Sequence, residues 1–525
     1  MQPTALNESA GTSPSQSRAA SWPHCLTLLV VLGTATLLRL RCLTCKPFWF
    51  DECFSVEVAR IGWRNFLRLM WWREANMSLY YFLLRVWLDF GQSPFLIRSL
   101  SAAISAATLP AIYWVAKQLF DRRVALIATA LLAVNAYSVR FAQEARSYAL
   151  FMLWATLSSG FLIAWASPDL RSQSATSNSQ ARRLRWYILT SVLAVYAHLY
   201  AILLIAGHWI VISRIPRSEG DQERLANIRR AWKVIGLAVL PLLIFVAKTG
   251  VGPIRWIQRP GVHDLFEFFE HLAGGTWALA LVYAAALVAA LIPAGKHLWK
   301  RDPSWQVWRC QFLLVWLLFP FVLTVLLSFA RPVFLARYMI FCLPALLTLV
   351  AAGLARLNRW LLPPALAAVL LLGLQGIAFV YGHDFDNERD ASGAAVNFIL
   401  DHTQPGDAII FHIAETRVPY EFFRSVRAGT NTASPEFSGS LGPEILFPHH
   451  GAGLDYLDFT GKPSPEFVRT TVQDHPRVWL MLMNNGPPER PDPTTAMLTQ
   501  ILPQSLAKVE RWEFPKVEIR LYSRR

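Results

Sequence analysis

The chain has 525 residues, of which 54% are hydrophobic and only 16% charged, and its formal net charge is +15. This small number of charged side chains cannot cover the surface of one soluble globule of this length. The composition therefore excludes a single soluble globular protein. The apolar surplus must face lipid. A membrane protein collects lysine and arginine in its cytoplasmic loops and against anionic lipid, so the positive charge predicts contact with membrane lipid and no nucleic acid partner.

Apolar stretches of about 20 residues, the length that a helix needs to cross the hydrocarbon core of a bilayer, recur from Trp22 to Tyr381. Beyond Tyr381 they stop. They predict about eleven transmembrane helices, near residues 23–43, 97–118, 123–139, 148–166, 186–199, 200–213, 233–248, 276–294, 310–330, 335–356 and 360–381.

Loop charges predict the orientation of these spans. With residues 1–22 as a cytoplasmic tail, and the first span retained instead of cleaved as a signal peptide, most loop arginines and lysines fall on the cytoplasmic side. The first external loop, residues 44–96, is a basic exception. Within it, Phe54 to Trp72 alternates apolar and basic residues at helical spacing, which predicts one amphipathic helix lying in the membrane interface. We expect a multi-pass protein of the plasma (inner) membrane.

Residues 382–525 have the composition of a small soluble domain. Helical and strand patterns follow one another here, near residues 391–400 (helix), 408–412 (strand), 478–483 (strand) and 495–521 (a last helix and strand). The sequence therefore predicts an all-α polytopic membrane domain, residues 23–381, followed by a small α/β extracytoplasmic domain.

Cysteines and histidines give weaker signals. Cys42, Cys45 and Cys53 lie near the first external loop, where a disulfide is chemically possible, and whether Cys45 pairs with Cys53 is left open. The residues His449, His450 and Asp455 could suggest a metal, but glycine and proline surround them and a plain loop is the better interpretation. The chain has no dinucleotide fingerprint, Walker loop or HExxH motif, so we expect no nucleotide cofactor.

The first candidate site is Trp49-Phe50-Asp51-Glu52, which follows the first span on the external side. Two adjacent carboxylates beside aromatic residues at a membrane surface are costly to place, which favours a function for them. The alternative is that Asp51 caps the interfacial helix, where its charge would favour the helix dipole.

A second candidate lies between the third and fourth predicted spans and, on this topology, on the same side as Asp51. It places a carboxylate, two guanidiniums and a phenol close together, in Glu144, Arg140, Arg146 and Tyr148. The alternative is an ordinary turn that carries a retention charge.

The third candidate is Arg337-Tyr338, with Arg331, at the external start of the tenth span. Positive charge there opposes the orientation rule, so an anionic ligand would explain it, although arginines that extend towards the interface would explain it as well. His198, in the turn between the fifth and sixth spans, also faces outward. A single histidine there is more often a hydrogen-bonded interfacial residue.

Taken in order, these motifs resemble those of the GT-C membrane glycosyltransferases, in particular the branch that holds protein O-mannosyltransferases and the aminoarabinose transferases of lipid A. The likeness covers residues 23–381 and is carried by Arg39 and Arg41, Trp49 to Glu52, Leu79-Tyr80-Tyr81, Gln143 to Tyr148, and Ala336-Arg337-Tyr338 with Pro344. One departure is Met77-Ser78, which stands where the family usually has Pro-Pro, and it puts the shape of this loop in question.

This resemblance implies a polyprenyl-phosphate sugar donor, a lipid, glycan or protein acceptor, and possible use of a divalent cation. It implies catalytic roles for Asp51, Glu52 and Glu144, with Asp51 as the base. It implies donor-phosphate contacts from Arg146, Arg337, Tyr338 and Arg140, since arginine binds phosphate through bidentate, permanently charged contacts. Side chains expected to line the substrate site are Trp49, Tyr80, Tyr81, Tyr148 and His198.

Two other classes of protein remain open at this stage. A transporter or lipid flippase would also have many spans and charged clusters, although it would tend to show inverted repeats and charges at mid-membrane depth. A structural membrane protein that binds a partner through its soluble domain would not depend on Asp51 or Arg146.

Overall fold

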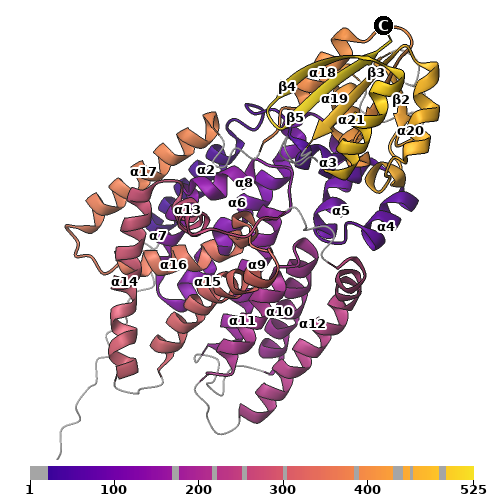
Figure 1. Cartoon of the computed structure of the whole chain (residues 1–525). Helices are drawn as coiled ribbons and strands as arrows, with labels where there is room; N and C mark the ends of the chain where they lie inside the picture. The colour runs from indigo at the N-terminus through magenta and orange to yellow at the C-terminus, as the bar shows by residue number, and fades with distance from the viewer. Residues whose placement is uncertain are drawn as a thin grey trace, which may run out of the picture.

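The computed structural model describes residues 22–167, 177–215, 221–250, 257–299, 304–383, 389–429, 441–449, 453–483 and 492–524. A large helical body carries a small five-stranded sheet domain at one end (Figure 1). The chain runs through the helical body first and enters the sheet domain after its last long helix. This is the predicted class, an all-α membrane domain followed by an α/β unit.

The helical body is made mainly of long apolar helices. Among the described residues, seven helices are long and apolar enough to cross a membrane: α6 (Pro94–Leu119), α9 (Tyr148–Ala166), α12 (Asp221–Thr249), α14 (Trp277–Trp299), α15 (Trp305–Ala330), the run of η4 (Ala336–Cys342) and α16 (Leu343–Leu354), and α17 (Leu362–Gly382). An eighth is formed if α7 (Arg122–Ala133) and α8 (Ala136–Ala142), which meet at a 60° bend, count as one span.

The predicted count of about eleven is not confirmed by this criterion. The remaining three predicted spans coincide with helices that are shorter or more polar: α2 (Trp22–Leu40), α10 (Ser177–Ala197) and α11 (Ala201–Ile212). In α10 the first half carries Arg182, Arg183 and Arg185, so its apolar part alone is shorter than a bilayer crossing.

Local sequence explains the bend between α7 and α8. Asn135 lies at the break, and its side-chain oxygen accepts a hydrogen bond from the backbone N–H of Ser138 at 2.9 Å. Asparagine is a favoured helix N-cap because it satisfies an amide that has no partner within the helix. The residue therefore ends one helix and starts the next, which directs residues 143–147 towards the sheet domain end of the body.

The predicted first loop, residues 44–96, forms three helices, α3 (Phe50–Arg60), α4 (Trp63–Trp72) and α5 (Ser78–Trp87). The prediction of one interfacial helix over Phe54 to Trp72 is wrong, because the chain leaves helical geometry at Ile61 and Gly62. Most of α3 is buried, whereas α4 exposes apolar side chains, namely Trp63, Leu67, Trp71 and Trp72.

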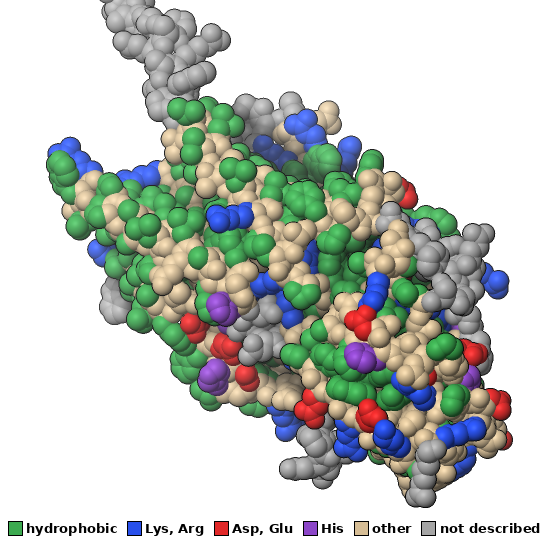
Figure 2. Space-filling model, turned by 90° about the horizontal axis from the view of Figure 1, so that it is seen from above, with side chains coloured by type: hydrophobic (Ala, Val, Ile, Leu, Met, Phe, Trp, Pro, Cys, Tyr) green, Lys and Arg blue, Asp and Glu red, His purple; other side chains and the backbone are tan. Residues whose placement is uncertain are grey.

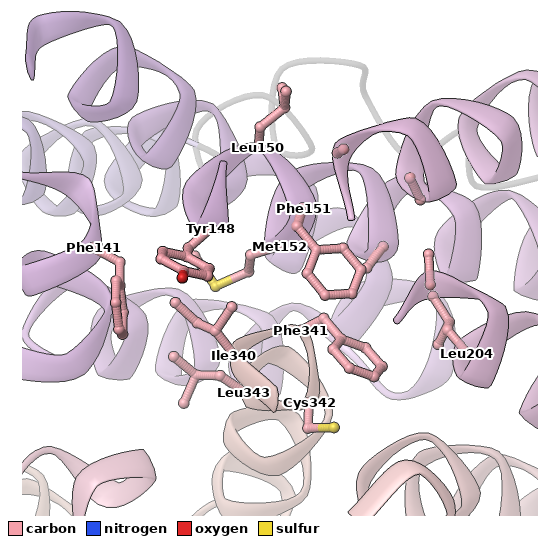
Figure 3. Packing of buried hydrophobic residues seen from close by; sticks show 14 of the residues in the cluster. Phe141, Tyr148, Leu150, Phe151, Met152, Leu204, Ile340, Phe341, Cys342 and Leu343 are labelled. Atoms are coloured by element: carbon pink, nitrogen blue, oxygen red, sulfur yellow. The ribbon is translucent and has the colours of Figure 1, made fainter. Parts of the chain in front are cut away.

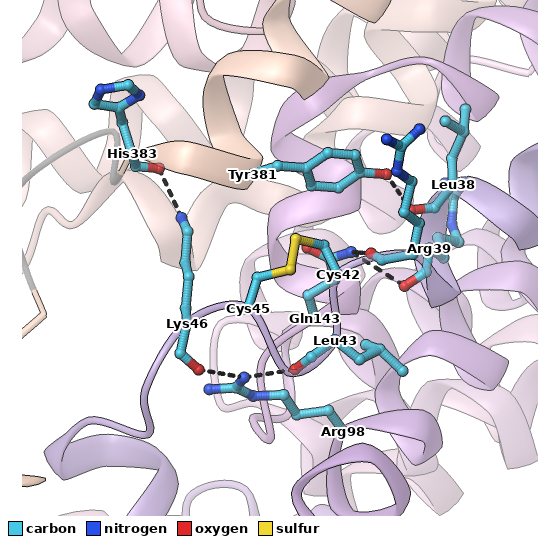
Figure 4. Close-up of a disulfide and its surroundings, with 11 residues drawn as sticks. Leu38, Arg39, Cys42, Leu43, Cys45, Lys46, Arg98, Gln143, Tyr381 and His383 are labelled. Atoms are coloured by element: carbon cyan, nitrogen blue, oxygen red, sulfur yellow. Dashed lines mark hydrogen bonds between the residues drawn. A yellow bond between two sulfur atoms is a disulfide. The ribbon is translucent and has the colours of Figure 1, made fainter.

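A disulfide and several hydrogen bonds fix the start of this loop (Figure 4). Cys42 is bonded to Cys45, while Cys53 is buried as a free thiol, which answers the pairing left open above. Lys46 donates to the carbonyl of His383 at 2.6 Å, just after α17. The loop is thus tied to the point at which the chain leaves the helical body.

The sheet domain is an α/β sandwich with strand order β2-β1-β3-β5-β4. Its strands are β1 (Asp407–Phe411), β2 (Glu444–Phe447), β3 (Arg477–Met483), β4 (Lys508–Phe514) and β5 (Val517–Ser523). Strand β1 pairs in parallel with β2 and β3, and β5 pairs antiparallel with β3 and β4.

Alternating side chains of the strands build one core on each face of the sheet. Ile409, Phe411 and Trp479 face α18 (Ser392–His402) and α19 (Arg417–Arg427). Ile410 and Leu480 face the other side, towards α20 (Pro465–Thr471) and α21 (Pro493–Ser505). Of these elements, the sequence missed α19, α20, β2 and the turn that splits its last strand into β4 and β5.

Surface composition distinguishes the two parts of the chain. Seen from the end that carries the sheet, hydrophobic side chains cover one side of the molecule, while charged side chains gather on the other (Figure 2). Long helices such as α12, α14 and α17 keep many apolar side chains exposed, including Leu237, Leu281 and Leu371. Such surfaces are stable only against lipid.

Candidate functional site

The candidate site lies where one end of the helical body meets the sheet domain. Five segments supply it: the first turn of α3, the segment after α4, the loop between α8 and α9, the helix η4, and the turn after α10. These segments carry the three motifs singled out in the sequence.

Asp51 and Arg146 form the central ion pair. A carboxylate oxygen of Asp51 lies 3.2 Å from Nη2 of Arg146, and the side chain of Asp51 is 20% exposed. Arg146 also donates to the backbone carbonyl of Asp51 at 3.4 Å. The N-cap of α3 is Trp49, so the interpretation of Asp51 as the cap is wrong, and its carboxylate is directed to a different partner.

Arg337 lies in the short helix η4, close enough to Arg146 for the two charges to interact. The two guanidiniums repel each other electrostatically, and both interact with the side chains of Tyr148 and His198. Both arginines are 9% exposed. Two permanent positive charges are therefore held close together in a largely buried position, an arrangement suited to an anion.

An aromatic layer surrounds these arginines. The rings of His198 and Tyr338 are 4.7 Å apart, and those of Tyr148 and Tyr338 are 6.5 Å apart. Deeper in the body, side chains of α9 face η4 and α16 (Figure 3), with the Phe151 and Phe341 rings 4.7 Å apart. This packing fixes the first turn of α9, and with it Arg146, relative to Arg337.

Glu52 faces away from Asp51 and belongs to a second network. Arg98, which is 1% exposed in α6, donates to both oxygens of the Glu52 carboxylate at 2.7 Å. The backbone N–H of Ala145 donates to it at 3.0 Å. Burial alone would raise the pKa of Glu52, but Arg98, Arg389 and this amide together bring the pKa below its ordinary value, so the side chain is ionised.

Glu144 belongs to the same second network. Its Oε1 lies 3.4 Å from Nε of Arg140 and 3.2 Å from Nη2 of Arg389. The described contacts of Glu144 and Arg140 therefore join them to Glu52 through Arg389, and not to the ion pair of Asp51 and Arg146.

The remaining expected site residues, Trp49, Tyr80 and Tyr81, are also buried. Tyr80 hydrogen-bonds Ser101 at 2.8 Å, and Tyr81 interacts electrostatically with Asp51 and Arg146. The ring of Trp49 lies 5.8 Å from the guanidinium carbon of Arg389.

Sequence reasoning missed Glu74, which follows α4. Its half-buried carboxyl interacts with Arg73, Arg146, Glu415 and Asp51, and burial, only partly offset by the two arginines, raises the pKa of Glu74 to about 7. The signal was weak, because a single Arg73-Glu74 pair in a basic loop looks like ordinary surface charge.

Two groups of described side chains have metal-ligand spacing, with ligand atoms within 4.8 Å of one another: His449, Asp455 and Asp458, and on the surface His263, Asp264 and Glu267. In the first, Arg417 donates to Asp458 at 2.9 Å and His449 hydrogen-bonds it at 2.9 Å. A guanidinium thus already neutralises the buried carboxylate. His450 lies outside the described residues.

Comparisons with known proteins show what fold this is. Neither a protein-family model nor the sequence of a curated protein matches the chain. Among solved structures, apo ArnT from Cupriavidus metallidurans matches with a TM-score of 0.61 at 13% identity, over 96% of this chain and 98% of that one. The chain adopts the GT-C fold.

Two further structures agree with the GT-C fold. ArnT from Cupriavidus metallidurans bound to undecaprenyl phosphate matches with a TM-score of 0.59 at 12% identity, over 94% of this chain and 97% of that one. The oligosaccharyltransferase AglB from Archaeoglobus fulgidus, in complex with an inhibitory peptide and a dolichol-phosphate, matches with a TM-score of 0.53 at 11% identity, over 88% of this chain and 69% of that one. The predicted GT-C architecture is confirmed.

Proposed function

We propose that this chain is an integral membrane glycosyltransferase that moves a sugar from a polyprenyl-phosphate donor to a lipid, glycan or protein acceptor at the extracytoplasmic face. The observation that carries the proposal is the pairing of Asp51 with Arg146, with Arg337 beside it. The GT-C fold supports it, because ArnT and AglB share this fold and their structures hold undecaprenyl phosphate and dolichol-phosphate respectively.

Asp51 is the proposed general base. The acceptor oxygen attacks the anomeric carbon as its proton passes to Asp51, the bond from that carbon to the phosphate oxygen breaks, and its electron pair leaves with the polyprenyl phosphate. Among the adjacent carboxylates Asp51 is the accessible one, since its side chain is 20% exposed while that of Glu52 is 0% exposed. Binding of the donor phosphate to Arg146 would free Asp51 to accept the proton.

Arg146 and Arg337 are the proposed ligands of the leaving phosphate. Negative charge on that phosphate grows as the sugar departs, and fixed guanidiniums stabilise it most where water is excluded. Their mutual repulsion in the free protein would be relieved by the incoming phosphate. Tyr338, Tyr148 and His198 lie against the same arginines and would orient the sugar or the phosphate.

Glu52, Glu144 and Arg140 have supporting roles in this proposal. Each is already engaged in the second network. The carboxylates of Asp51, Glu52 and Glu144 all pair with guanidiniums in this structure, so the proposed reaction routes no step through a divalent cation.

Orientation follows from the same proposal. The site and the sheet domain lie at one end of the helices, and the expected orientation makes that end extracytoplasmic, with residues 1–22 in the cytoplasm and the protein in the plasma (inner) membrane. The disulfide between Cys42 and Cys45 supports this, because disulfides persist outside the reducing cytosol. A reporter enzyme that is active only outside the cytosol, fused after Arg525, tests it.

The deciding experiment is a transfer assay. Purified protein in lipid nanodiscs is incubated with a panel of polyprenyl-phosphate sugars and candidate acceptors, with and without a chelator. Wild-type protein should release the sugar from at least one donor, and Asp51→Asn should abolish this while expression and folding stay normal. Asp401→Asn, at an exposed surface of the sheet domain, is the matched control.

A transporter would give a different result in the same nanodiscs and in proteoliposomes. It would move a lipid or solute across the bilayer without breaking the bond from sugar to phosphate. Wild-type turnover in Asp51→Asn would refute the assignment of the base.

A further inference from the structure

The segment that enters the sheet domain reaches back into the site. Arg389 precedes α18, and its Nη1 and Nη2 lie 3.2 Å from the carboxylates of Glu52 and Glu144 respectively. The side chain is 9% exposed, and Nη1 also donates to the carbonyl of Pro47 at 3.2 Å. One side chain from the start of the sheet domain thus joins two motifs that lie about ninety residues apart in the helical body.

Asp390, the next residue, holds the first turn of α3. Its Oδ2 accepts a hydrogen bond from the backbone N–H of Phe50 at 2.7 Å, and its Oδ1 accepts from the backbone N–H of Ser392 at 3.0 Å. The first amides of a helix have no partner within it, and Trp49 at the N-cap position offers no side-chain acceptor. The carboxylate of Asp390, just before α18, therefore caps the first turn of α3.

Other contacts between the first loop and the sheet domain reinforce this docking. Arg73 pairs with Glu415, the guanidinium of Arg68 lies 4.1 Å from the ring centre of Tyr456, and the Phe48 and Phe422 rings are 4.9 Å apart. The domain is therefore packed against α3 and α4 on the side away from the helical body.

Resting on the function proposed above, we propose that Arg389 and Asp390 are positioning residues, through which the sheet domain sets the place of Asp51. Asp51 lies between Phe50, which Asp390 holds, and Glu52, which Arg389 holds. Both backbone neighbours of the base are thus fixed by the sheet domain, while Arg98 and Arg146 fix the same turn from the helical body. The sheet domain therefore helps to hold the turn of α3 that carries Asp51.

This proposal predicts a specific pattern in three variants. Arg389→Ala should bind undecaprenyl phosphate within about twofold of wild type, since Arg146 and Arg337 are untouched, yet lose about 100-fold in turnover because the base is displaced. Arg389→Lys, which keeps the positive charge but cannot reach both carboxylates with a planar guanidinium, should recover part of the turnover. Arg427→Ala, which removes an exposed arginine paired with Asp401 in the same domain, is the matched control and should behave as wild type.

A measurement that needs no substrate separates this inference from the proposed function. Backbone amide hydrogen exchange in nanodiscs should become faster across the first turn of α3 in Arg389→Ala and in Asp390→Ala, and should stay at the wild-type rate in Arg427→Ala. If no donor is used by the wild-type chain, the proposed function fails, but this exchange result still decides whether the two residues hold the turn.

Unchanged exchange in α3 for both alanine variants would overturn the inference. So would faster exchange with wild-type turnover, because Asp51 would then be placed without these contacts. A loss of undecaprenyl phosphate binding as large as the loss of turnover would also overturn it, because it would mean general damage to the site.

Discussion

Asp51 and Glu52 are adjacent in α3, yet Arg146 binds one carboxylate and Arg98 binds the other, in two different networks. The Asp51 pair faces the site and is partly exposed, whereas the Glu52 pair is fully enclosed. Their neutral amide variants should therefore affect different properties of the protein.

Glu52→Gln should lower stability more than Asp51→Asn, because the Asp51 pair is partly exposed. Removing one partner of a buried ion pair leaves the other charge uncompensated, which costs about 3–5 kcal/mol. Here Arg98 would remain buried at 1% exposure without its carboxylate. Thermal unfolding of both variants in the same detergent checks this. Equal melting temperatures would mean that the Glu52 network does not stabilise the fold more than the Asp51 pair does.

The motif residues could be predicted from the sequence because each motif is contiguous. Asp51, Arg146 and Arg337 come from three segments that topology alone places at one end of the helices, and the structure brings them together. What could not be predicted is which side of each segment faces which partner. Glu144 and Arg146 are two residues apart, and the turn between α8 and α9 sends them into different networks.

Arg98 and Arg389 were missed for different reasons. Arg98 lies at the start of a predicted span, where a charged residue needs a partner, so the rule that charges in membranes are paired could have linked it to Glu52. Arg389 follows a loop in a domain whose docking is set by long-range packing, and no local pattern marks it. The break of the loop helix at Gly62 had a signal, since glycine inside a helical pattern lowers the expectation of continuity.

Glu74 should make stability depend on pH around neutrality. Its pKa in the folded chain is raised to about 7, above the ordinary value of 4.5, so the folded state binds more protons between these values. The stabilising contribution of protonated Glu74 is therefore fully present below about pH 4.5. It is lost as pH rises through about 7, and above that pH Glu74 no longer makes stability depend on pH.

Glu74→Gln removes this dependence, because glutamine does not titrate. The melting temperature of the variant relative to wild type should rise between pH 5 and pH 8 by roughly 2 °C, a small shift because the chain is long. Thermal scans at pH 5, 6, 7 and 8 measure it. Parallel curves for the two proteins would show that the pKa of Glu74 is ordinary.

Met77 should not tolerate proline, although the GT-C glycosyltransferases that the sequence resembles usually have Pro-Pro in place of Met77-Ser78. Its backbone has φ +67° and precedes α5, whereas the proline ring fixes φ near about −65°. The adjacent Asn76 accepts a hydrogen bond from the backbone N–H of Leu199 at 3.0 Å, so a distorted loop would also release the turn that carries His198.

Met77→Pro should therefore lower both the melting temperature and the transfer rate. Met77→Leu is the matched control, since it keeps an apolar side chain of similar volume at a buried position and should cost less than about 1.5 kcal/mol. A proline variant with wild-type stability would mean that the loop has a second conformation that accepts proline.

Gly353 should be required where α16 crosses α14. A Cβ atom at this position would lie 1.8 Å from the carbonyl oxygen of Ala286, a backbone atom that cannot move aside without shifting α14. Small residues allow such close approach between membrane helices, and overpacking costs about 1–3 kcal/mol. Because η4, which carries Arg337, runs directly into α16, the displacement should reach the site.

Gly353→Ala should thus lower the melting temperature and weaken binding of undecaprenyl phosphate, while Gly236→Ala should do neither. Gly236 lies in α12, and a Cβ atom there meets nothing within 4 Å. Alanine also favours the helical conformation over glycine by about 1 kcal/mol, so the control variant should be slightly more stable than wild type. If both alanine variants gain stability, the crossing of α14 and α16 is looser than described and Arg337 does not depend on it.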